Sequence, residues 1–126
     1  SLNAGFSTGT PWLKVGKSYK DINVEKEIDG PIFTFYKELI RLRKEMRIIS
    51  EGSYLPVMED SQEVYAFERH LDGQKLLVLN HFYGSEAEVA IPADYQAGCV
   101  LLSNYENVEL SEKVILKQYQ TLAILA

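Results

Sequence analysis

Residues 63–83 read EVYAFERHLDGQKLLVLNHFY, and this stretch decides the fold of the chain. Two runs rich in apolar, β-branched and aromatic residues, Glu63–His70 and Lys75–Tyr83, flank the four residues LDGQ at 71–74. Asp-Gly between two such runs is a strong hairpin signal, because both central residues of the favoured turn take positive φ. The stretch therefore predicts two long antiparallel strands joined by a tight turn at Asp72 and Gly73.

Shorter strands are expected on both sides of this hairpin. Residues 54–58 predict an edge strand, because Pro56 has no N–H to donate to a ladder. In residues 86–92 apolar residues alternate with glutamates, so we expect Glu86 and Glu88 to face water while Ala87, Val89 and Ile91 lie in the core. Three further short strands are expected, at Cys99–Leu102, Val114–Leu116 and Thr121–Leu125. Short strands at this spacing predict an antiparallel β-sandwich or open barrel.

One strong helix is expected before the strands. Gly30 and Pro31 form its start signal, since Pro at the first helical position loses no hydrogen bond. Basic residues gather toward its end, where cations favour the negative pole of the helix dipole, and Gly52 ends the pattern. The apolar face is wider than one partner surface normally requires. That face consists of Ile32, Phe35, Tyr36, Leu39, Ile40, Leu42 and Met46.

The first roughly thirty residues form a leader with neither a helical nor a strand period. Loops longer than about 12–15 residues are uncommon in compact domains unless they are functional or disordered. Disorder fits poorly, because Phe6, Trp12, Leu13 and Val15 make the leader too apolar for a solvated tail. We therefore expect the leader to lie on a surface that this chain does not contain, and the chain to be a fragment.

Composition excludes several classes of function. The chain has 126 residues and a formal net charge of -5 with scattered Lys and Arg, which argues against a nucleic-acid-binding surface. No apolar run approaches the roughly 18 residues of a membrane span. Cys99 is the single cysteine, so an internal disulfide is impossible and a cytoplasmic location is expected.

A search for catalytic or metal-binding residues yields only weak candidates. Glu59 and Asp60 are adjacent carboxylates, and we expect a solvated turn rather than a hydrolytic pair, which would need carboxyl groups flanking a bond. His70 and His81 lie on the two hairpin strands and could face each other, but two imidazoles alone make a poor zinc site. Cys99 heads an apolar strand and is expected to be a small buried residue rather than a nucleophile.

Two further binding chemistries have little support in the sequence. The glycines of the leader do not follow a strand and open a helix, so a phosphate-binding loop is not supported; they are Gly5, Gly9 and Gly16. Trp12 and the eight tyrosines could stack on sugar rings, although aromatic residues in strands usually belong to the core. We therefore expect no catalytic, cofactor-binding or metal-binding residue in this chain.

Four segments carry a resemblance to a known family. They are NAGFSTGTPWL at residues 3–13, YKDINV at 19–24, IFTFY at 32–36 and LIRLRK at 39–44. They resemble the end of a family 13 glycoside hydrolase, of the group that contains oligo-1,6-glucosidase, dextran glucosidase and trehalose-6-phosphate hydrolase. The resemblance continues more loosely through GSY at residues 52–54 and KLLVLN at 75–80.

The resemblance implies a specific architecture. Residues 1–49 would be a leader loop and the last helix of a (β/α)8 catalytic barrel, and residues 50–126 a C-terminal antiparallel β-sandwich of the α-amylase type. The Asp, Glu and Asp residues that perform catalysis in this family lie upstream of the segment that resembles it, so none is expected here. The chain would then be a non-catalytic part of a cytoplasmic α-glucosidase for short α-1,6-linked oligosaccharides, giving structural support to the absent barrel.

Two alternatives remain open at this stage. The sandwich could be a carbohydrate-binding module, or the chain could be a free-standing interaction domain that docks a partner through its helix. We expect the barrel-facing surface to make the isolated chain self-associate, because monomers rarely expose large apolar patches. No cofactor, nucleic acid or membrane partner is expected.

Overall fold

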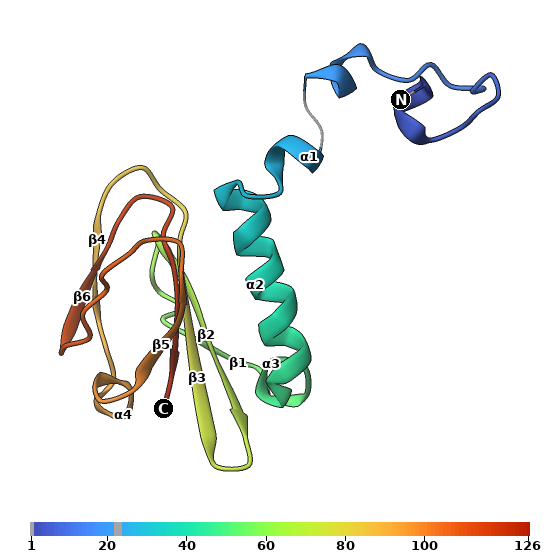
Figure 1. Cartoon of the computed structure of the whole chain (residues 1–126). Helices are drawn as coiled ribbons and strands as arrows, with labels where there is room; N and C mark the ends of the chain where they lie inside the picture. The colour runs from blue at the N-terminus through green and yellow to red at the C-terminus, as the bar shows by residue number, and fades with distance from the viewer. Residues whose placement is uncertain (1, 22–23) are drawn as a thin grey trace. The chain divides into compact units, whose positions relative to one another are not determined.

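A computed structural model describes residues 2–21 and 24–126 of the chain. The chain divides into two compact units, residues 1–41 and residues 42–126. Figure 1 traces the chain from the leader to the C-terminal strands.

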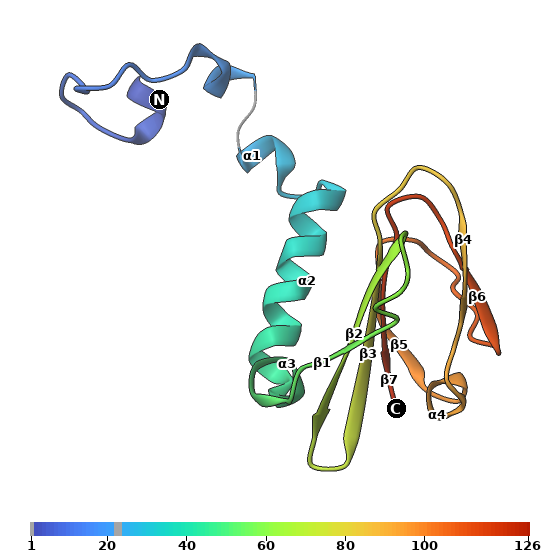
Figure 2. The same ribbon diagram turned by 180° about the vertical axis from the view of Figure 1, so that it is seen from behind.

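The second unit contains two antiparallel sheets. The larger has five strands in the order β1-β2-β3-β7-β5, and the smaller pairs β4 with β6. The strands are β1 (Leu55–Val57), β2 (Val64–Leu71), β3 (Gln74–His81), β4 (Ala87–Ala90), β5 (Cys99–Ser103), β6 (Lys113–Leu116) and β7 (Thr121–Leu125). The two sheets face each other in both views (Figures 1 and 2), which confirms the predicted antiparallel sandwich.

The central hairpin forms as predicted. β2 and β3 pair over their whole length, from Val64 opposite His81 to Leu71 opposite Gln74. Asp72 has φ 50° and Gly73 has φ 84°, so both central residues of the turn adopt the left-handed conformation. The predicted edge strand is also confirmed, since β1 pairs only with β2 and contains Pro56.

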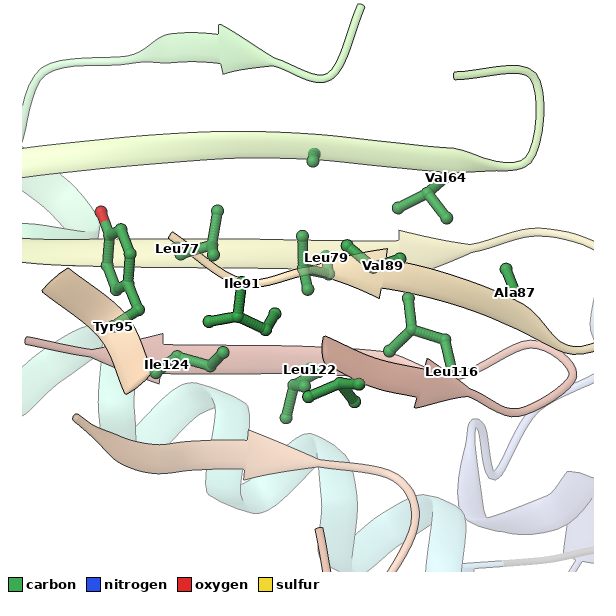
Figure 3. Close-up of a cluster of buried hydrophobic side chains, with 12 residues drawn as sticks. Val64, Leu77, Leu79, Ala87, Val89, Ile91, Tyr95, Leu116, Leu122 and Ile124 are labelled. Atoms are coloured by element: carbon green, nitrogen blue, oxygen red, sulfur yellow. The ribbon is translucent and has the colours of Figure 1, made fainter. Parts of the chain in front are cut away.

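The main core lies between the two sheets (Figure 3). The alternation predicted for β4 is confirmed, because Ala87, Val89 and Ile91 are buried whereas Glu86 and Glu88 are exposed. The other fully buried members of this core are Val64, Ala66, Leu77, Leu79, Tyr95, Val114, Leu116, Leu122 and Ile124. Tyr95 comes from a short helical turn that the sequence analysis did not predict, α4 (Ala93–Gln96).

The second core lies on the opposite face of the five-stranded sheet. There Leu76 of β3 and Ala123 of β7 are buried together with Ile48 of the short helix α3 (Arg47–Glu51). The helix α3 packs against β2 and β3. The larger sheet is therefore covered on one face by β4 and β6 and, at one end of its other face, by α3.

The predicted single helix is two helices in the structure. α2 spans Pro31–Glu45, and it begins at the predicted proline. Met46 then takes an extended conformation, with φ −108° and ψ 102°, before α3 begins at Arg47. The expectation of one helix up to Gly52 was therefore wrong, although Gly52 does end α3. The break allows Ile48 to pack on the sheet. This packing is a tertiary contact, so the helical periodicity of the sequence could not predict it.

The leader contains only short turns: η1 (Leu2–Gly5), η2 (Lys17–Lys20) and α1 (Val24–Glu27). The absence of a long helix or strand over its described residues agrees with the sequence analysis. None of the helices formed by the described residues combines the length and the apolar character needed to traverse a bilayer.

We expect Ile91→Ala to lower the free energy of unfolding by about 2–5 kcal/mol, because the side chain is 3% exposed and its removal leaves a cavity between the sheets. Urea denaturation would measure the change. Ile115→Ala is the matched control, since Ile115 lies nearby in the smaller sheet but is 58% exposed. Equal effects of the two substitutions would contradict this account of the core.

Candidate functional site

The residues considered for catalysis do not come together. Glu59 and Asp60 are exposed in the loop between β1 and β2, as expected for a solvated turn. Cys99 is also exposed, so the expectation of a buried cysteine was wrong. Strand β5 is an edge strand of the five-stranded sheet, and Cys99 is its first residue. A residue at the end of an edge strand has fewer neighbouring segments to bury it.

The two histidines lie at opposite ends of the hairpin. His70 is opposite Lys75 beside the turn, whereas His81 is opposite Val64 at the far end, so the expectation that they could face each other was wrong. His70 contacts the Glu68 carboxylate at 2.8 Å. His81 is buried, and its Nδ1–H donates to the Lys117 carbonyl at 3.0 Å. That hydrogen bond gives His81 a packing role, which is the interpretation that the sequence analysis favoured.

Among the described residues, no group of three or more His, Cys, Asp or Glu side chains could hold a metal ion. The most perturbed acid is Tyr95, whose pKa is raised by burial and further by the nearby Glu68 carboxylate. The phenol is neutral at physiological pH even at its ordinary pKa, and its position in the core makes Tyr95 a packing residue.

The first contact surface is the junction between α3 and the sheet, which is held by Arg69. From the outer side of β2, Arg69 Nε donates to the Ile48 carbonyl at 3.0 Å and Nη2 donates to the Gly52 carbonyl at 2.8 Å. The Ile48 carbonyl also accepts from the Gly52 N–H at 3.2 Å, so Arg69 adds a second hydrogen bond there and a further one to the carbonyl of the C-cap residue Gly52. Arg69 therefore both caps α3 and ties it to the strand.

The backbone at Gly52 permits this close approach. A Cβ atom there would lie 2.5 Å from the Ile48 carbonyl oxygen and 3.3 Å from the Arg69 Cβ, so a larger residue does not fit. The next residue, Ser53, continues the attachment, because its N–H donates to the His70 carbonyl at 3.0 Å and its Oγ accepts from the His70 N–H at 3.1 Å. The chain thus passes from helix to sheet through a dense set of hydrogen bonds.

The second surface is an exposed apolar stripe on α2. Ile32, Tyr36 and Ile40 follow one another at helical spacing and are 72%, 62% and 53% exposed. Leu39 extends the stripe and is also exposed. The sequence analysis predicted this wide apolar face, and the structure leaves most of it uncovered.

The third surface is the beginning of the leader, which a single side chain organises. Asn3 Nδ2 donates to the Ser7 carbonyl at 2.9 Å and to the Gly9 carbonyl at 2.8 Å, which closes the loop. Asn3 itself has φ 51°, a conformation that Asn tolerates better than most residues. Residues 3–15 curve around an open hollow of about 670 Å³, and Phe6 and Trp12 in its lining are 85% and 92% exposed.

The sandwich itself exposes more aromatic surface than the sequence predicted. Tyr54 and Tyr65 are both about half exposed, and their hydroxyls contact each other. The Phe67 ring lies 5.3 Å from the ring of Tyr54 and 6.0 Å from that of Tyr65. Tyr65 and Phe67 alternate with the buried Val64 and Ala66, so strand parity alone directs these rings away from the main core.

We expect Arg69→Met to lower the free energy of unfolding by about 1.5–3 kcal/mol, since it removes charge-assisted hydrogen bonds to the carbonyls of Ile48 in α3 and of its C-cap residue Gly52. Hydrogen exchange at residues 48–52 should accelerate together with this loss of stability. Arg47→Met is the control, because the ion pairs of Arg47 with Glu51 and Asp72 are exposed and such pairs contribute little. Unchanged exchange in Arg69→Met would contradict the capping role.

Two family models match the chain in succession. Residues 1–52 match the α-amylase catalytic domain, and residues 64–122 match the C-terminal domain of the α-amylase SusG. The sequence is 43% identical over 111 residues to the oligo-1,6-glucosidase of Halalkalibacterium halodurans, which covers 85% of this chain and 20% of that protein. It is 37% identical over 126 residues to the trehalose-6-phosphate hydrolase of Bacillus subtilis, covering 95% of this chain and 22% of that protein.

Solved structures agree with these matches. The trehalose-6-phosphate hydrolase of Bacillus licheniformis superposes with a TM-score of 0.78 and 42% identity, over 99% of this chain and 24% of that one. The trehalulose synthase of Pseudomonas mesoacidophila gives a TM-score of 0.81 at 32% identity, over 99% and 23%. The chain thus spans about a fifth of the length of the curated relatives it matches. It belongs to the α-amylase family, glycoside hydrolase family 13, and corresponds to a C-terminal portion of the glucosidases in that family.

Proposed function

We propose that this chain is the non-catalytic C-terminal part of a cytoplasmic α-glucosidase that hydrolyses α-1,6-glucosidic bonds in short oligosaccharides. In this proposal residues 1–49 belong to the catalytic barrel as its final loop and helix, and residues 50–126 form a sandwich that packs on the barrel. The role of the sandwich is structural: it braces the last barrel helix through α3.

The observation that carries the proposal is the exposed apolar stripe of α2 together with the exposed rings of the leader. Ile32, Tyr36, Ile40, Phe6 and Trp12 are each more than half exposed. Burial of apolar surface contributes about 25 cal/mol per Å² of stabilisation, so covering these side chains with a partner would add several kcal/mol of stability. Such a surface is expected to have a partner, and the match of residues 1–52 to the α-amylase catalytic domain supports the barrel as that partner.

The diversity of the relatives supports a structural rather than a catalytic role. Their names include an oligo-1,6-glucosidase, a trehalose-6-phosphate hydrolase and a trehalulose synthase, yet all share this segment. Relatives that catalyse different reactions are expected to share this segment if the catalytic residues lie elsewhere in the protein. The scattered positions of the histidines, of Cys99 and of the Glu59–Asp60 pair fit this view.

A complementation experiment tests the proposal. The oligo-1,6-glucosidase of Halalkalibacterium halodurans would be truncated to remove the segment that this chain matches, and expressed with and without the chain. We expect the truncated enzyme to be insoluble or inactive alone, this chain to show no turnover of isomaltose, and the pair to recover activity. Turnover of isomaltose by the purified chain would contradict its non-catalytic assignment.

Two variants sharpen this experiment. Ile40→Asp places a charge in the apolar stripe and should abolish recovery, because a carboxylate buried at the barrel surface has no partner there. Lys37→Asp changes charge at an exposed position of the same helix, outside the stripe, and should leave recovery intact. Equal recovery with both variants would show that the stripe does not form the contact.

We also expect the isolated chain to self-associate through the same uncovered surfaces. A two-fold dimer would bury the stripe of each copy and is the commonest symmetry of oligomers. Light scattering at micromolar concentration should then report a mass above the 14.3 kDa of one chain. A monodisperse monomer would contradict this expectation without affecting the complementation test.

A further inference from the structure

An open groove lies at the end of the β2–β3 ladder that is farthest from the Asp72–Gly73 turn. Its volume is about 490 Å³, within the range of small-ligand sites in proteins. Its lining combines apolar residues, among them Val57, Val64 and Ala66, with residues that carry carboxylate, amide, hydroxyl and aromatic groups. The lining residues with polar, charged or exposed aromatic side chains include Glu59, Ser61, Gln62, Glu63, Phe82 and Tyr83.

Local hydrogen bonds hold one wall of this groove in place. Ser61 Oγ accepts from the Val64 N–H at 3.1 Å, and the Ser61 N–H donates to the Met58 carbonyl at 2.9 Å. Met58 takes φ 58°, an uncommon conformation for a residue with a side chain, which persists where the surroundings determine it. The loop with Glu59 and Gln62 is thus ordered by its own contacts and by the start of β2.

The aromatic wall is held in the same way. Phe82 is 63% exposed although its N–H donates to the Glu63 carbonyl at 3.3 Å. Tyr83 is 52% exposed although its carbonyl accepts from the Tyr119 N–H at 3.2 Å. Two large rings are therefore presented to solvent from backbone that is fixed to neighbouring segments, and such preorganisation lowers the entropic cost of binding.

The charges of the groove restrict its ligand. Among the described residues that line it, Glu59 and Glu63 carry charge, and none is Lys, Arg or His. An anionic ligand would meet two carboxylates with no compensating cation, so phosphorylated compounds are disfavoured. A neutral polyol fits, because its hydroxyl groups can donate to the carboxylates while a flat apolar face of a sugar ring lies on Phe82 or Tyr83.

We propose that this groove binds a neutral gluco-oligosaccharide. The sugar ring would stack on Phe82 and Tyr83, and its hydroxyls would donate to Glu59, Glu63 and the Gln62 amide oxygen. The choice of glucose as the sugar rests on the proposed function, whereas the neutral charge and the stacking follow from the groove itself.

Titration of the isotopically labelled chain with isomaltotriose tests this proposal. We expect saturable shifts of backbone amides confined to residues 58–66 and 82–84, and no saturable shift with glucose 6-phosphate. Phe82→Ala and Tyr83→Ala should each weaken binding about fivefold to tenfold, the effect of losing one ring contact. The double substitution of Glu59 and Glu63 by Gln should also weaken binding, since carboxylates accept stronger hydrogen bonds than amides do.

Tyr36→Ala is the matched control, because Tyr36 is 62% exposed and is not among the residues that line the groove. It should leave the affinity unchanged. Absence of saturable shifts with isomaltotriose, shifts confined to the leader around Trp12, or equal binding of glucose 6-phosphate would each overturn the proposal. If activity is recovered in the complementation test but isomaltotriose causes no shifts, only the groove assignment is overturned. If isomaltotriose shifts the groove residues but activity is not recovered, only the proposed function is contradicted.

Discussion

The central strand β3 is apolar on both of its faces, and the rest of the second unit depends on covering it. Leu77 and Leu79 point into the core between the sheets, while Leu76 and the half-buried Val78 point to the other side. A strand of this kind is stable only between two covering layers. The β4–β6 pair supplies one layer, and α3 with Ile48 supplies part of the other.

The way α3 covers the sheet links packing to function. A helix that continued without interruption from Pro31 to Glu51 would follow one axis, whereas the extended residue Met46 allows a new direction before Ile48. Arg69 then joins the end of α3 to β2 through two carbonyls, and Gly52 provides the space that this contact needs. In a family 13 glucosidase such a junction would transmit the stability of the sandwich to the helix that precedes it.

Much of this fold could be predicted from the sequence because the relevant forces are local. The alternation in residues 86–92 reflects a period of two that any half-buried strand must have. Asp72 and Gly73 specify their turn through the conformations that they tolerate, and Pro31 marks the start of α2 for a similar reason. The apolar excess on α2 and in the leader was also evident without coordinates, because it exceeds what a solvated surface carries.

The sequence by itself determined the hairpin, the inward residues of β4, the edge position of Pro56 and the presence of uncovered apolar surface. Only the tertiary structure decided which side chains meet. It placed His70 and His81 at opposite ends of the ladder, exposed Cys99 at a sheet edge, and interrupted the helix at Met46. It also brought residues 56–66 together with Phe82 and Tyr83 into one groove. The physical reason is that strand pairing joins residues distant in sequence, and their register depends on the whole set of buried contacts rather than on any local preference.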